Sequence, residues 1–150
     1  MLTIRQGSFE EAIAIKANIP EMHEVEPVSQ LLERIGSSPY LLLIAEVDGE
    51  LAGFKLGYET SKAEVCFYSW QGGVLPAYRS QGIAKELLLA QESRVAELGY
   101  KKITVKSMNR FAHMMKMLLS NGYQISGYQQ KTGPEDAKIS FFKRLGNRRL

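Results

Sequence analysis

The residues best suited to bind a ligand lie in one stretch from Val74 to Leu88, which reads VLPAYRSQGIAKELL. A short apolar segment runs into Pro76, a polar turn follows, and apolar residues then recur with the spacing of an amphipathic helix. The start of a helix presents unpaired backbone N–H groups and the positive end of the helix dipole, so it binds anions. Gly82 and Ala84 carry no bulky side chain, so a ligand can approach the backbone closely there. The stretch therefore predicts a turn that binds phosphate groups.

The pattern V-x-P followed by R-x-x-G-x-A resembles the acyl-coenzyme A signature of the GNAT superfamily, the Gcn5-related N-acetyltransferases. The motif alone is also compatible with an ordinary surface turn, but its place between a strand-like and a helix-like segment favours ligand binding. The resemblance implies that acetyl-CoA is the donor and that the amides of this loop hold the coenzyme pyrophosphate. Arg79 is expected either to add a charge-assisted bond to the pyrophosphate or to tie down the loop. The loop residues assigned to the cofactor are Arg79, Ser80, Gln81, Gly82, Ile83, Ala84 and Lys85.

Two glycines stand just before this signature. The resemblance implies that backbone groups at the end of the fourth strand bind the pantetheine arm and orient the thioester carbonyl, at Gly72, Gly73 and Val74. Adjacent glycines favour a β-bulge that splays this strand from its neighbour and opens a slot for the ligand. The alternative is an ordinary turn that ends the strand. A backbone amide near Val74 is expected to polarise the thioester carbonyl, in an oxyanion-type role.

A second part of the resemblance lies beyond the expected strand Ile103–Lys106. Asn109 matches the family residue that bonds the pantetheine arm, and an asparagine is also a suitable helix N-cap. Many family members place a tyrosine four residues before the glycine-aromatic pair that ends the next helix, and this tyrosine protonates the leaving thiolate. Here the pair is Gly122-Tyr123 and the equivalent position is Leu118, which cannot donate a proton. The usual general acid is therefore missing, or another group supplies the proton.

Transfer to an amine also calls for a base, because an alkyl amine is protonated near neutral pH. Tyr68 and Glu64 share one face of the expected strand Ala63–Val74, and Tyr68 falls where the histone-acetylating branch of the family carries its glutamate. Glu24 belongs to an acidic loop, residues 21–26, of the kind that walls the acceptor site in this fold. These three residues are the catalytic candidates. The structural alternatives stay open: a core aromatic ring for Tyr68, and solvated carboxylates for Glu64 and Glu24.

The surrounding pattern predicts the elements that position these residues. Ser8 and Glu11 have the spacing of a capping box, so a helix is expected to begin near Phe9. Asp48-Gly49 between two β-rich runs predicts a hairpin. The expected order is β-α-α-β-β-β-α-β-α-β-β, a mixed α/β sheet with helices packed on it. This order matches the GNAT fold with its splayed central strands.

Composition limits the class of protein. The 150 residues suit a single domain, 1–150, and 45% hydrophobic with 23% charged residues is ordinary for a soluble globular protein. No apolar run is long enough to cross a bilayer and no signal peptide is recognised, so a cytoplasmic location without membrane association is expected. The single cysteine, Cys66, excludes a disulfide framework and leaves no cysteine cluster for a metal. The net charge of +3 is scattered along the chain, so nucleic-acid binding is not expected.

These patterns together favour an N-acetyltransferase that moves an acetyl group from acetyl-CoA directly to a primary amine of a small molecule or a peptide, without a metal. The acidic loop favours a cationic acceptor. The missing tyrosine leaves a second interpretation open, an acyl-CoA-binding regulatory or sensor module with little catalysis. A homodimer is a further expectation, since family members often dimerise through late strands and Ser140-Phe141-Phe142 could contribute.

Overall fold

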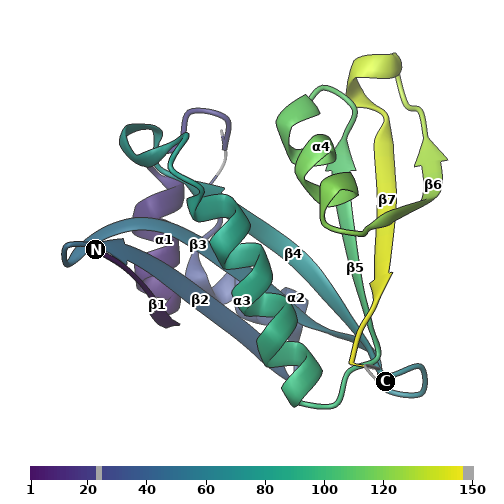
Figure 1. Ribbon diagram of the computed structural model, residues 1–150, viewed down its shortest axis with the longest axis horizontal. Coiled ribbons are helices and arrows are strands. Elements are labelled where there is room, and N and C mark those ends of the chain that lie inside the picture. Colours follow the sequence, from purple (N-terminus) through teal and green to yellow (C-terminus); the bar gives the residue numbers. More distant parts are fainter. Residues whose placement is uncertain (23–24, 147–150) are drawn as a thin grey trace.

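The computed structural model describes residues 1–22 and 25–146 (Figure 1). In this part of the chain seven strands form one mixed sheet in the order β1-β2-β3-β4-β5-β7-β6, in which only β4 and β5 run parallel. The sequence of elements confirms the expected order and the mixed α/β class. The elements are β1 (Leu2–Gln6), α1 (Phe9–Lys16), α2 (Val28–Ile35), β2 (Tyr40–Val47), β3 (Glu50–Ser61), β4 (Cys66–Val74), the short 3-10 helix η1 (Pro76–Tyr78), α3 (Ile83–Glu97), β5 (Lys102–Met108), α4 (Ala112–Ser120), β6 (Gln124–Gln129), η2 (Pro134–Asp136) and β7 (Lys138–Arg144).

Local chemistry explains two of the boundaries. Ser8 Oγ accepts a hydrogen bond from the Glu11 amide at 3.1 Å, and the Glu11 carboxylate accepts one from the Ser8 amide at 2.9 Å. This reciprocal pair is the predicted capping box, and α1 begins at Phe9 as expected. Asp48 (φ 50°) and Gly49 (φ 85°) both adopt positive φ between β2 and β3, as a tight hairpin turn requires.

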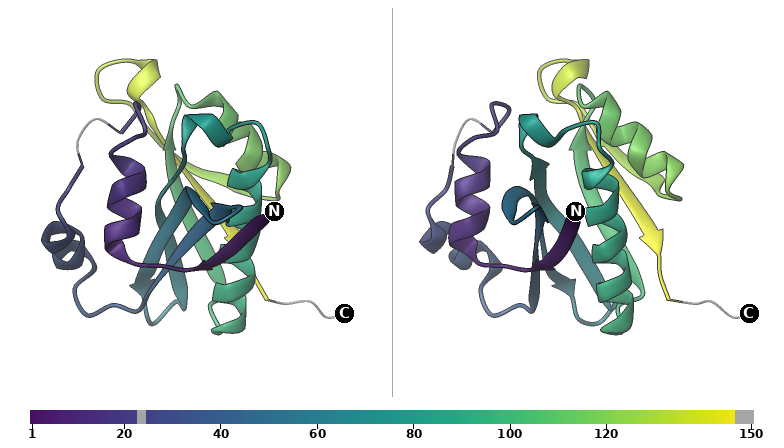
Figure 2. Two further views of the ribbon diagram at one scale, coloured as in Figure 1. Left: turned by 90° about the vertical axis from the view of Figure 1, so that its left-hand side faces the viewer. Right: turned by 60° about the vertical axis from the view of Figure 1, so that its left-hand side comes forward.

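One face of the sheet is covered by α1 and α2 (Figure 2). On this side the alternate β3 residues Phe54, Leu56 and Tyr58 are buried, together with Ile15 of α1 and Leu31 of α2. The side chains between them on β3 consequently point to the opposite face, beneath α3.

α3 and α4 cover that opposite face and share one core. Leu87 and Leu88 of α3 are buried with Leu118 of α4, Ile103 of β5 and Phe141 of β7. Because this core includes strands from both sides of the β4–β5 boundary, it joins the two halves of the sheet.

β4 is shorter than the sequence pattern predicts. It begins at Cys66 instead of Ala63, because residues 62–65 form a turn in which Val65 adopts φ 53°. A turn with positive φ at a β-branched residue interrupts the alternation on which the longer strand was based.

α4 also begins later than predicted. Phe111 is its N-cap residue and makes no side-chain capping bond, so the expectation that Asn109 caps this helix is wrong. The Asn109 amide donates instead to the Ala137 carbonyl at 3.0 Å, just beyond the last pair of β5 with β7. The chain remains attached to β7 at that point and turns into the helix only afterwards.

β7 lies inside the sheet, between β5 and β6. Phe141 is fully buried, and Ser140 pairs with both neighbouring strands. The backbone of Ser140–Phe142 therefore has no free edge for strand pairing with a second copy, and the free edge of this half of the sheet is β6.

Two features are absent from the described residues, a membrane-spanning helix and a metal-binding cluster. None of the described helices combines the length and the hydropathy needed to cross a bilayer. No three His, Cys, Asp or Glu side chains within residues 1–22 and 25–146 gather to hold a metal ion.

Candidate active site

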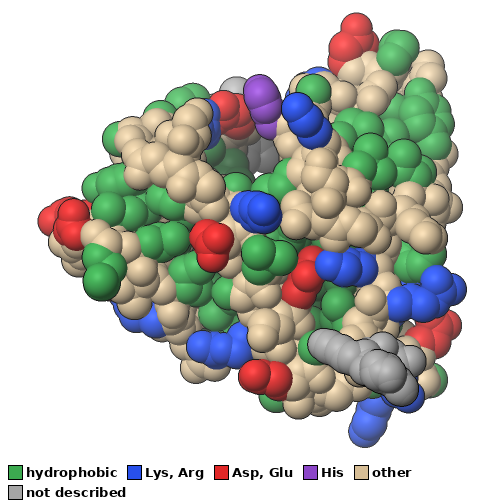
Figure 3. Space-filling model, viewed as in Figure 1, with side chains coloured by type: hydrophobic (Ala, Val, Ile, Leu, Met, Phe, Trp, Pro, Cys, Tyr) green, Lys and Arg blue, Asp and Glu red, His purple; other side chains and the backbone are tan. Residues whose placement is uncertain are grey.

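The two halves of the sheet separate along the boundary between β4 and β5 (Figure 1). Pairing runs only from Cys66 to Ser69 on β4 and from Lys102 to Val105 on β5. Beyond these residues β4 stays paired with β3, and β5 stays paired with β7. Figure 3 shows a notch between the halves at the upper edge of the molecule, above this split. Residues 70–74 of β4 therefore have an open edge.

A β-bulge marks the place where β4 leaves β5. The register between β3 and β4 shifts by one residue at Trp70, and a bulge bends and twists its strand. Gly72 and Gly73 pair regularly with β3, so the predicted bulge at these glycines is wrong. Gly73 makes room for a neighbour instead, because a Cβ there would lie 2.6 Å from Ile19 Cδ1. A Cβ at Gly72 would be in ordinary contact with Lys55 Nζ, at 3.4 Å.

Backbone amides of β4 point into the split at two residues. The Leu75 amide donates to the Ala52 carbonyl beside β3 at 2.8 Å. Successive N–H groups of a strand point to opposite sides, so Gly73 also faces β3, whereas Gly72 and Val74 face the open side. An extended ligand along β4 would therefore meet the amides of Gly72 and Val74.

The loop after β4 forms a turn that leads directly into α3. Ser80 (φ 64°) and Gly82 (φ 81°) adopt left-handed conformations, and Gly82 is the N-cap residue of α3. The backbone N–H groups from Ser80 to Lys85 donate to no carbonyl of the described chain. A run of unpaired amides at a helix start can bind a diphosphate, as the sequence predicts.

Arg79 ties this loop to two neighbours. Its Nε donates to the Val74 carbonyl at 3.1 Å. Its terminal nitrogens bind the Glu21 carboxylate at 3.0 and 2.9 Å. Of the two roles expected for Arg79, these contacts support the one of holding the loop, and they link β4 to the segment after α1.

On the β5 side of the split, neither family position offers a general acid. Asn109 is exposed beyond the end of β5. Leu118 is fully buried in the core beneath α4. The position assigned to the catalytic tyrosine is thus an apolar packing position in this chain.

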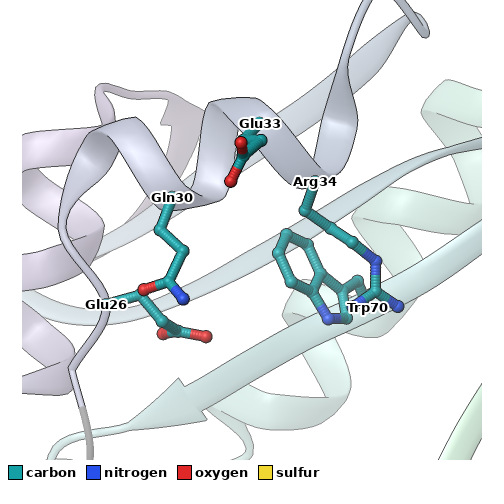
Figure 4. A pocket seen from close by; sticks show the side chains of 5 residues that line it. All are labelled: Glu26, Gln30, Glu33, Arg34 and Trp70. Atoms are coloured by element: carbon teal, nitrogen blue, oxygen red, sulfur yellow. The ribbon is translucent and has the colours of Figure 1, made fainter.

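A cavity of about 270 Å³ lies beside the bulge, on the face covered by α1 and α2 (Figure 4). It is lined by Glu26, Gln30, Glu33, Arg34 and Trp70. The Arg34 guanidinium lies 5.1 Å from the centre of the Trp70 ring and donates through Nε to Tyr58 Oη at 3.0 Å. The cavity therefore combines an aromatic wall with two carboxylates and one guanidinium.

Glu26 is held ionised at the base of this cavity. It forms an ion pair with the buried Lys16 and accepts a hydrogen bond from Gln71 Nε2 at 3.4 Å. Burial acts to raise the pKa of Glu26, but the hydrogen bond and the charge of Lys16 outweigh it and lower the pKa below the ordinary value. The carboxylate thus remains negative near neutral pH.

Tyr68 belongs to an aromatic group next to the cavity. Its ring and that of Trp70 both pack edge-on against Tyr58, at 5.7 and 5.5 Å between centroids. The Lys106 ammonium lies 5.7 Å from the centre of the Tyr68 ring. Burial raises the pKa of the Tyr68 phenol, so it stays protonated at neutral pH and is poorly suited to act as a base.

Of the other two catalytic candidates, the structure places only Glu64, and it lies away from this site. Glu64 is exposed in the turn between β3 and β4, at the opposite end of β4 from Gly72 and Val74, and its amide donates to Ser61 Oγ at 3.1 Å. Glu24 lies outside the described residues.

Comparison with known proteins identifies the family. The model of the acetyltransferase (GNAT) family matches residues 8–123. The chain belongs to this family. It is 30% identical over 102 residues to an acetyltransferase of Photorhabdus laumondii subsp. laumondii, covering 67% of this chain and 69% of the relative.

Solved structures share the fold of this GNAT protein. The ribosomal-protein-S18-alanine N-acetyltransferase from Escherichia coli gives a TM-score of 0.82 at 16% identity, over 97% of this chain and 94% of that one. A GNAT superfamily phosphinothricin acetyltransferase from Sinorhizobium meliloti, solved in complex with AcCoA, gives 0.76 at 16% identity, over 97% and 89%. Family and fold together identify this chain as an acyltransferase.

Sequence reasoning missed several residues of this GNAT site. Arg34 and Glu33 belong to no recognisable sequence motif. They line the cavity because α2 packs beside β4. Trp70 carried a signal, since it shares a strand face with Tyr68. Lys55 carried none, because a lysine inside a β-rich run reads as a solvent-facing residue, whereas this side chain is buried.

Proposed function

We propose that this enzyme binds acetyl-CoA along the open edge of β4 and transfers the acetyl group directly to a primary amine. The observation that carries the proposal is the presence of unpaired amides in two neighbouring segments. One segment is Gly72 and Val74 on the open edge of β4, and the other runs from Ser80 to Lys85 at the start of α3. A coenzyme on this path places its diphosphate on the helix start and its extended arm against the strand.

The Gly72 amide is the donor that polarises the thioester carbonyl in this proposal. It points into the split and is fixed by the regular pairing of Gly72 with β3. A donor already directed at the place where negative charge develops stabilises the tetrahedral transition state. The acceptor nitrogen then attacks the carbonyl carbon in a ternary complex, without a covalent intermediate on the enzyme.

The cavity lined by Trp70 supports a cationic amine as acceptor. Glu33 supplies negative charge beside Glu26, which is paired with Lys16, and Trp70 supplies an aromatic wall for a cation or an apolar group. The Arg34 side chain adds a donor for an acceptor that also carries a carboxylate. Small polyamines and peptide amines both fit this chemistry.

The direct test follows release of the coenzyme A thiol from acetyl-CoA with a panel of amines. Cationic amines should accelerate the release. Glu33→Gln should raise the KM of the amine several-fold without changing the KM of acetyl-CoA. Glu97 is an exposed carboxylate at the far end of α3, so the control variant Glu97→Gln should change neither KM. Absence of turnover with every amine would contradict the proposal.

One observation favours a second candidate, an acyl-CoA-binding module with little catalysis. The position that corresponds to the catalytic tyrosine is Leu118, which is fully buried and has no proton to donate. This candidate predicts tight coenzyme binding by calorimetry together with a turnover that Glu33→Gln leaves unchanged.

A further inference from the structure

Lys55 places a buried amine directly over the active-site half of β4. It lies on β3 as the partner of Gly72, and it is 5% exposed on the face beneath α3. A Cβ at Gly72 would lie 3.5 Å from Lys55 Cγ and 3.4 Å from Nζ. The lysine chain therefore lies in contact distance of β4 at Gly72, where β4 has already left β5.

No described residue hydrogen-bonds or ion-pairs with the Lys55 amine. The charge that acts on it is Glu92 of α3, and that carboxylate is already bound by Tyr123 Oη at 2.7 Å and by Lys143 Nζ at 3.0 Å.

The polar neighbours of Lys55 are unsatisfied as well. Ser69 Oγ and both polar atoms of the Gln91 side chain are buried without a partner in the described chain. The Gln91 amide and Ser69 lie close together because both are next to Gly57. A Cβ at Gly57 would lie 3.0 Å from Gln91 Nε2, and Gly57 is the strand partner of Ser69. Ser69 is also the last β4 residue that pairs with β5. Unsatisfied polar groups thus gather at the closed end of the split.

An unpaired amine in such surroundings is costly to bury. Burial lowers the pKa of Lys55 to about 8, although the Glu92 carboxylate acts in the opposite direction. At neutral pH the amine therefore still carries its proton but gives it up readily. The reference pKa of a thiol is about 8.5, so an amine of this kind is matched to a leaving thiolate.

Resting on the function proposed above, we propose that the Lys55 ammonium is the proton donor to the sulfur of coenzyme A, in place of the tyrosine that this chain lacks at Leu118. The acceptor nitrogen forms the new C–N bond, the C–S bond breaks, and its electron pair leaves with the sulfur. The sulfur takes a proton from Lys55 Nζ. Lys55 regains a proton from solvent, and the proton lost by the acceptor amine balances it.

The contact between Lys55 and the sulfur can be tested without catalysis, by comparing the binding of coenzyme A with that of desulfo-CoA, which lacks the sulfur. Calorimetry at pH 7.5, where Lys55 still carries its proton, should give the wild type about a tenfold preference for coenzyme A, as expected for a charge-assisted bond to the sulfur. Lys55→Met should bind both ligands equally. Lys143→Met is the matched control, because it removes the other lysine near Glu92, and it should keep the preference.

Kinetics provide the second readout. In the wild type kcat should fall as the pH rises through about 8, because Lys55 then loses its proton. In Lys55→Met kcat should be about a hundredfold lower and this limb should be absent. Lys55→Gln should behave in the same way, and it replaces Lys55→Met if that variant does not fold.

The outcomes separate the two proposals. If the wild type binds neither ligand, the proposed function fails. If coenzyme A binds but Lys55→Met keeps both the preference and the alkaline limb, the function stands and the role of Lys55 is refuted. Equal binding of the two ligands by the wild type also refutes it.

Discussion

Absent side chains shape the active-site half of β4. Gly73 leaves room for Ile19, and Lys55 lies in contact distance of Gly72 on the other face of the strand. Neither glycine is needed for a positive φ, because both pair regularly with β3. The small size of Gly73 lets the apolar segment after α1 pack closely against β4.

The buried amine predicts a conflict between function and stability. Lys55→Met should stabilise the fold by up to about 3 kcal/mol at pH 7, because the pKa of Lys55 falls from 10.5 to about 8 on folding. Between these values the unfolded chain binds more protons, so wild-type stability rises with pH and the advantage of the variant disappears near pH 10.5. Urea denaturation of both proteins from pH 7 to 10.5 measures this, and a variant less stable than wild type at pH 7 would contradict it.

A carboxylate at the start of α1 predicts a second pH dependence, at the acid end of the scale. Hydrogen bonds from Arg5 and from the Ser8 amide lower the pKa of Glu11 to about 2. The stability that Glu11 provides is therefore complete above about pH 4.5 and lost as the pH falls through 2. Melting temperatures from pH 6 to 2 should converge for wild type and Glu11→Gln. The exposed neighbour Glu10 provides the control, since Glu10→Gln should follow wild type throughout.

At the scale of elements, the sequence predicted those features that local chemistry decides. The capping box at Ser8, the turn at Asp48-Gly49 and the loop before α3 each depend on residues close together in the chain. The bulge at Trp70 and the late start of α4 could not be predicted, because they depend on pairing with β3 and β7. Long-range pairing overrides local preference at both places.

The loop between β4 and α3 carries a prediction at this scale. Gly82 adopts φ 81°, so Gly82→Ala should strain the N-cap of α3 and move the amides that follow it. Affinity for coenzyme A should fall about tenfold, with a stability loss of about 1 kcal/mol. Gly99→Ala, at the other end of the same helix, has a similar φ of 99° and should lower stability alone. Equal affinities of Gly82→Ala and wild type would contradict this assignment.

A buried contact connects α3 to the late strands. Tyr123 Oη donates to Glu92 at 2.7 Å, and burial together with this bond raises the pKa of Tyr123. Tyr123→Phe should cost about 1.5 to 3 kcal/mol, as expected for a bond to a charged group. Tyr128→Phe removes an exposed hydroxyl and should cost almost nothing, and urea denaturation compares the two.

At the scale of the whole molecule, the split sheet serves the proposed chemistry. The shared core of α3, α4 and both sheet halves holds β4 and β5 apart beyond Ser69. The open edge of β4 meets the helix start above it, the charged cavity on one face and the Lys55 amine on the other. The family signature predicted the loop, whereas the cavity and the amine arise only when distant segments pack together.

The central claim is that coenzyme A lies along β4 and against the start of α3. Amide NMR during titration with coenzyme A tests it residue by residue, because Gly73 is an internal control between two contact positions. The account predicts large shifts and slowed exchange at Gly72, Val74 and the amides of 80–85, with little change at Gly73, which already faces β3. Unchanged signals at these positions, or shifts confined to another surface, would contradict it.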